Sequence, residues 1–61
     1  MIIVERRFKN IYGVFQYETL YKSDDYFKSE KFFKNYKTAD RLELWNSLQG
    51  ELLAVREVTN A

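Results

Sequence analysis

The first part of the chain alternates between apolar and charged positions with a period of two. Ile2, Val4 and Phe8 fall on one side of an extended backbone, and charged residues fall mainly on the other. Asn10 and Gly13 then interrupt the pattern, and both residue types tolerate the positive φ that hairpin turns require. This pattern predicts a strand over 2–8 followed by a turn.

A second alternating stretch over 14–21 completes an N-terminal β-hairpin. It is rich in aromatic and β-branched residues, which suit the pleated surface of a strand. Neither of its faces is cleanly polar. The face expected to carry the rings consists of Phe15, Tyr17, Thr19 and Tyr21.

The period changes to that of a helix over 24–36. Ser23 is a suitable N-cap, and two aspartates follow it near the positive end of a helix dipole. The residues within about 120° of a helical wheel are Tyr26, Ser29, Phe32, Phe33 and Tyr36. A helix is predicted here, although a strand over 32–37 is an alternative that the pattern leaves open.

The segment 38–58 is expected to organise the core. Leu42, Trp45 and Leu48 share one side of a helix over 39–49, with Thr38 as N-cap and Gly50 as the left-handed closing residue. An apolar strand is predicted over 51–58. This interpretation places the single Trp against the sheet.

The same segment also fits a second hairpin. Residues 41–45 could pair with 52–55 around a five-residue loop that Gly50 closes. The helix is preferred because Leu48 would be an apolar residue at an exposed loop tip in the hairpin, whereas it joins Trp45 in the helix. Both alternatives remain consistent with the sequence.

These elements predict one α+β domain over 1–61. A small antiparallel-rich sheet, formed by the N-terminal hairpin and the C-terminal strand, would pack against one or two short helices. A chain of 61 residues buries only about 60% of the surface that its unfolded form exposes. Its expected stability is about 3–9 kcal/mol, and association with a partner is the remaining way to add to it.

The residue types exclude most catalytic and metal chemistry. The chain has no Cys and no His, so metal sites of those ligands and His-assisted nucleophiles are ruled out. Its two glycines lie far apart and cannot form a phosphate-binding loop. Asp24, Asp25 and Glu30 lack the spacing of a calcium loop and fit the start of a helix. We therefore predict no enzyme activity, catalytic residue, metal or cofactor.

Charge and terminal composition give an expectation about location. Ten basic and nine acidic residues leave a formal charge of +1, so no global field attracts nucleic acid or a membrane. The apolar run at residues 1–4 is too short for a signal sequence or a membrane span. The absence of Cys fits a reducing compartment. A cytoplasmic protein is expected.

The surplus of aromatic residues is the strongest functional signal. Five Tyr, five Phe and one Trp exceed what one thin core can bury, and Tyr and Trp are favoured at protein interfaces. Exposed Tyr is also ordinary in strands. The rings least explained by a core, and therefore assigned to partner binding, are Tyr12, Phe15, Tyr17, Tyr21 and Phe27. The leading prediction is a non-catalytic protein-binding module, with a homodimer through the second strand also possible.

An alternative function is single-stranded nucleic-acid binding by the segment 26–37. Lysines interleaved with aromatics could follow phosphates while bases stack on the rings. The same residues also fit the core face of a helix with lysines as its solvated edge. The candidate nucleic-acid-binding residues are Tyr26, Lys28, Lys31, Lys34, Tyr36 and Lys37.

In size, lack of Cys and His, and aromatic content, the chain resembles the short accessory proteins that bacteriophages make to bind and block host enzymes. The resemblance covers composition and no motif. It implies a small viral inhibitor or regulator of a larger host protein.

Overall fold

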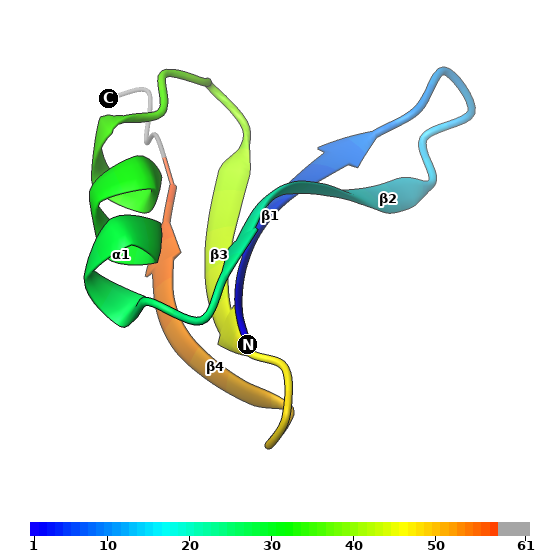
Figure 1. Ribbon diagram of the computed structural model, residues 1–61. Coiled ribbons are helices and arrows are strands. Elements are labelled where there is room, and N and C mark those ends of the chain that lie inside the picture. The colour runs from blue at the N-terminus through cyan, green and yellow to red at the C-terminus, as the bar shows by residue number, and fades with distance from the viewer. Residues whose placement is uncertain (58–61) are drawn as a thin grey trace.

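A computed structural model describes residues 1–57 and contains four strands and one helix (Figure 1). The elements are β1 (Ile2–Lys9), β2 (Phe15–Ser23), α1 (Tyr26–Asn35), β3 (Arg41–Asn46) and β4 (Glu51–Arg56). All neighbouring strands are antiparallel, and their order in the sheet is β2-β1-β3-β4. The helix packs on one face of this sheet (Figure 1). The predicted α+β class is confirmed.

The N-terminal hairpin is also confirmed. The Asn10 side-chain oxygen accepts hydrogen bonds from the backbone N–H groups of Tyr12, at 2.9 Å, and Val14, at 3.1 Å. Gly13 has a φ of 77°, which lets the chain reverse without a steric penalty. The Asn and Gly therefore perform the turn-forming roles expected of them.

A β-bulge in β2 corrects the predicted face of Tyr21. Val4 lies opposite Tyr21, but the next residue, Glu5, lies opposite Thr19, so Leu20 is an extra residue in β2. The bulge reverses the alternation beyond it. Tyr21 therefore lies on the helix side of the sheet, away from the face that carries Phe15 and Tyr17.

The helix expected over 24–36 exists as α1, and the alternative strand over 32–37 is wrong. The N-cap of α1 is Asp25 instead of the predicted Ser23, because the Asp25 carboxylate accepts hydrogen bonds from the backbone N–H groups of Phe27 and Lys28. The Ser23 hydroxyl accepts from the Asp25 N–H at 3.0 Å. Tyr36, directly after α1, is extended.

The helix predicted over 39–49 is wrong, and the hairpin alternative is confirmed. β3 forms backbone hydrogen bonds to β1 on one side and β4 on the other, which a helix at this place would leave unmade. Leu48 lies in the turn between β3 and β4 and is 86% exposed. Gly50 has the expected left-handed conformation, at φ 62°, but it closes a hairpin loop.

Two related predictions about this segment also change. The Thr38 hydroxyl accepts from the Asp40 N–H at 3.1 Å in a local turn and caps no helix. The C-terminal strand, expected over 51–58 in one sheet with the N-terminal hairpin, belongs to that sheet but joins it through β3 and ends at Arg56. Val58, its predicted last residue, lies outside the described residues.

The core lies between α1 and the sheet. Its buried side chains are Val4, Phe33, Leu42 and Leu44. Ser29 on α1 is also fully buried, and its hydroxyl donates a hydrogen bond to the Asp25 carbonyl at 3.1 Å. The polar group of this small buried side chain therefore has a hydrogen-bond partner. The core is therefore thin and depends on a few large aliphatic and aromatic groups.

Trp45 does not belong to this core, contrary to the sequence prediction. Strand alternation directs Leu42 and Leu44 toward α1 and places Glu43 and Trp45 on the other face. There the indole N–H donates to the Glu43 carboxylate at 2.9 Å, and Arg41 Nε donates to it at 2.8 Å. The buried carboxylate is thus paired, and Trp45 is only half-buried.

Candidate functional site

The β1–β2 hairpin continues beyond the rest of the sheet as a narrow projection (Figure 1). β3 pairs with β1 only as far as Arg7, so Phe8 and Lys9 have strand partners in β2 alone. We call residues 8–17 the hairpin arm. It points away from α1 (Figure 1).

Apolar side chains cover the tip and one side of the hairpin arm. Ile11 is 91% exposed and Tyr12 is 83% exposed, and Val14, Phe15 and Tyr17 are each more than half exposed. Several large apolar groups exposed on one short element are typical of an interaction site. The arm therefore presents unburied contact area that the fold itself does not use.

Cations and ion pairs fix the base of the hairpin arm. The Arg7 guanidinium lies over the Phe15 ring, 3.8 Å from its centroid. The Arg6 guanidinium forms two ion pairs, one with Glu18 of β2 at 3.4 Å and one with Asp40, just before β3, at 3.3 Å. The arm is thus tied to the sheet at its base, while its apolar tip stays open to solvent.

The predicted partner-binding residues divide between different surfaces. Tyr12, Phe15 and Tyr17 lie together on the hairpin arm. Phe27 is exposed at the first turn of α1, away from the arm. Tyr21 is half-buried on the helix side of β2.

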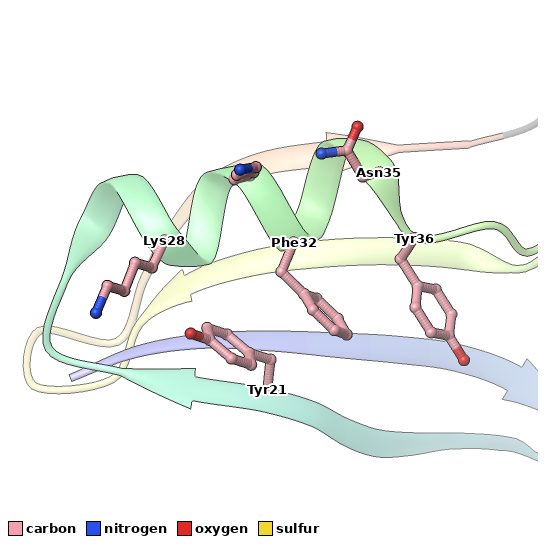
Figure 2. A pocket seen from close by; sticks show the side chains of 6 residues that line it. Tyr21, Lys28, Phe32, Asn35 and Tyr36 are labelled. Carbon is pink, nitrogen blue, oxygen red and sulfur yellow. The ribbon is translucent and has the colours of Figure 1, made fainter.

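Tyr21 lines a second surface, an open groove of about 490 Å³ between β2 and α1 (Figure 2). We call this the aromatic groove. Three rings stack along the groove. The ring centroids of Tyr21 and Phe32 are 4.8 Å apart, and the angle between their planes is 9°. The centroids of Phe32 and Tyr36 are 5.3 Å apart, and their planes meet at 25°. The remaining lining residues are Lys28, Lys31 and Asn35.

The aromatic groove contains half of the residues predicted for nucleic-acid binding. Lys28, Lys31 and Tyr36 line it, whereas Lys34 is outside its lining and pairs with Glu30 at 3.6 Å. Lys37 is exposed and also outside the lining.

Sequence reasoning did not assign Phe32, Asn35 or Tyr21 to this groove. A spacing of i, i+3, i+4 and i+7 from Lys28 through Lys31 and Phe32 to Asn35 carries the signal for one helical face. Tyr21 had no such signal, because its orientation depends on the bulge at Leu20. Four of the six lining residues could thus be predicted from helical periodicity.

Tyr26 is engaged on its own helix. Its hydroxyl donates to the Glu30 carboxylate at 3.0 Å, and this hydrogen bond, with the nearby negative charge, raises the pKa of Tyr26 above its ordinary value of about 10. Tyr26 is also outside the lining of the aromatic groove.

Replacing Glu30 with Gln should lower the pKa of Tyr26 toward 10. Because the folded-state pKa is raised, the stabilisation from this pair is present below pH 10 and is lost as the pH rises through the folded pKa. A pH titration followed by the NMR shifts of ¹³C-labelled tyrosine rings measures this change. An unchanged Tyr26 titration in Glu30→Gln would contradict the hydrogen bond.

Within residues 1–57, no three acidic side chains gather closely enough to hold a metal ion, and α1 is too short to cross a membrane. Comparison of the chain with family models, with curated proteins and with solved structures gave no match. The hairpin arm and the aromatic groove are therefore the two candidate functional surfaces of residues 1–57.

Proposed function

We propose that this protein is a non-catalytic protein-binding module that inserts its hairpin arm into a recess of a larger protein. The observation that carries the proposal is the exposed apolar tip on an arm whose base is anchored. An arm that is already ordered loses little conformational freedom on binding, so more of its contact energy appears as affinity. Ile11 and Tyr12 are the two anchors.

The surroundings of the arm support a protein interface. At its base, a recess of about 440 Å³ is lined by Arg7, Lys9, Asp40 and Glu57, together with aromatic groups. Charged groups of both signs therefore border the apolar arm. Protein interfaces commonly have this arrangement, with an apolar centre and a polar rim.

A larger partner fits the shape of the arm better than a second copy does. A narrow convex arm buries its sides fully only in a concave surface. Insertion of the arm into the aromatic groove of another copy would be a head-to-tail contact, which forms open chains unless the rotation closes. A recess on a different protein avoids this problem.

Occupation of a recess on a larger protein blocks whatever else that recess binds. The module would then act as an inhibitor or regulator, which is the role implied by the compositional resemblance to phage accessory proteins. The absence of Cys fits a partner in the cytoplasm.

The test compares an arm variant with a matched variant at the opposite turn. Ile11→Ser with Tyr12→Ser removes the two apolar anchors, and Leu48→Ser changes an equally exposed residue in the β3–β4 turn. Tagged proteins capture partners from nuclease-treated extract of the source cells, and purified partner then gives affinities. We expect the arm variant to bind at least tenfold more weakly, since interface anchors contribute about 1–2 kcal/mol or more each.

Two further measurements make the comparison decisive. Thermal melts should show that both variants are as stable as wild type, because the changed side chains contact solvent. Sedimentation should show a monomer. Equal capture by the arm variant would overturn the proposal, and a wild-type dimer that the arm variant abolishes would assign the arm to self-association instead.

A further inference from the structure

We propose that the aromatic groove between β2 and α1 is a binding site for single-stranded nucleic acid. This site is separate from the hairpin arm and would serve a second ligand. The proposal rests on the ring stack, on two free lysines and on one exposed amide, which the fold places around one groove (Figure 2).

The ring stack can be extended by nucleobases. Phe32 lies between two rings, whereas Tyr21 and Tyr36 each have only one aromatic neighbour among residues 1–57. Each outer ring is half-buried and keeps a surface without an aromatic partner. Bases stack on such rings whatever their sequence, because every base has a π-face.

The charges around the groove complement a phosphate backbone. Lys28 and Lys31 lie about one helical turn apart on α1, both are exposed, and neither forms an ion pair within the described part of the chain. Lys34, outside the groove, is instead paired with Glu30. The two unpaired ammonium groups therefore lie where phosphates beside stacked bases would pass.

Asn35 adds a group that can contact base edges. Its side-chain amide has two donors and one acceptor carbonyl, which match the mixed edges of a nucleobase. It is exposed at the end of α1, near Tyr36 in the lining of the groove (Figure 2). Aromatic, cationic and amide groups thus all contribute to the lining of one groove.

The open shape of the groove favours a single strand. In a duplex the base faces cover one another, whereas an unpaired strand can turn its bases onto protein rings. A free nucleotide would gain contacts at only one end of the stack. A strand of a few nucleotides can use both outer rings and both lysines.

The experiment measures the fluorescence anisotropy of labelled ten-nucleotide dT and U strands, with a duplex of equal length for comparison. Two released counterions predict that affinity falls about sevenfold between 50 and 200 mM salt. Lys28→Gln with Lys31→Gln should weaken single-strand binding at least tenfold and flatten this salt dependence. Tyr36→Leu should weaken binding at both salt concentrations and leave the salt dependence unchanged.

A charge-matched control is Lys22→Gln with Lys34→Gln, which removes two exposed lysines outside both the groove and the hairpin arm. It should stay within about threefold of wild type. Equal weakening by both double variants, equal affinity for duplex, or no binding of single strands at 50 mM salt would overturn the proposal. The groove variant should still capture the partner of the hairpin arm, so either proposal can fail without the other.

Discussion

Leu44→Ala should lower the free energy of unfolding by about 2–5 kcal/mol. Leu44 is 1% exposed and packs in the cluster of Val4, Phe33 and Leu42 between α1 and the sheet. Truncation removes apolar burial and leaves a cavity that so small a core can fill only in part. Because the whole domain is expected to have about 3–9 kcal/mol, this single change should bring it close to unfolding at room temperature.

Urea and thermal unfolding followed by circular dichroism measure the loss. In a domain of this size each kcal/mol shifts Tm by about 4–8 °C. Leu52→Ala is the matched control, because Leu52 is a leucine of the neighbouring strand that is 41% exposed. It should cost much less. Equal losses for the two leucines would contradict the placement of the core on the α1 side of the sheet.

Arg56→Ala should have the second largest effect, a loss of about 1.5–3 kcal/mol. The Arg56 guanidinium reaches from β4 to the end of α1, where it donates to the carbonyls of Phe33, at 2.8 Å, Lys34, at 3.1 Å, and Tyr36. These carbonyls include groups that have no partner within the helix. A cation at this end also favours the helix dipole.

Hydrogen exchange of the backbone amides in the last turn of α1 is the specific readout. Faster exchange is expected in Arg56→Ala, and Arg56→Lys should give an intermediate result because it keeps the charge but not the planar set of donors. Lys22→Ala is the control, since Lys22 is exposed and forms no ion pair among residues 1–57. If the Arg56→Ala and Lys22→Ala variants have equal stability and equal exchange rates, the hydrogen bonds from Arg56 to the end of α1 do not stabilise the helix.

The hydrogen bonds of Arg56 also link the stability of the α1 end to the shape of the aromatic groove. Asn35 and Tyr36 line the groove and lie at the helix end that Arg56 holds. β4 is therefore coupled to a surface that it does not itself line. A frayed helix end would displace the outer ring of the stack.

Neighbouring residues in the sequence were sufficient to predict the N-terminal hairpin and α1. Asn10 and Gly13 specify a turn by their own side-chain bonding and backbone freedom, and residues around 26–35 have one helical face. The cap was predicted two residues early, because Ser23 and Asp25 are both good acceptors. These elements depend on neighbours within a few positions, which is why the sequence alone reveals them.

Residues 39–49 show where local reasoning fails. Their apolar positions fit a period of 3.6 and a period of two, so Trp45 and Leu48 were placed in a core that they do not enter. The open edge of β1 decides the outcome, since only an extended β3 can satisfy its backbone groups. That edge is created by a segment more than thirty residues away in the chain.

The two candidate surfaces likewise depend partly on the sequence alone and partly on the tertiary structure. The sequence by itself determined that aromatic residues exceed the capacity of the core, and that lysines and rings alternate over 26–37. Only the tertiary structure decided which rings meet. The bulge at Leu20 turns Tyr21 toward Phe32, while pairing of β3 with β1 stops at Arg7 and leaves Tyr12 and Phe15 on a free arm. The bulge in β2 and the point where β3 stops pairing with β1 involve segments that are distant in the chain, so periodicity within one element does not reveal them.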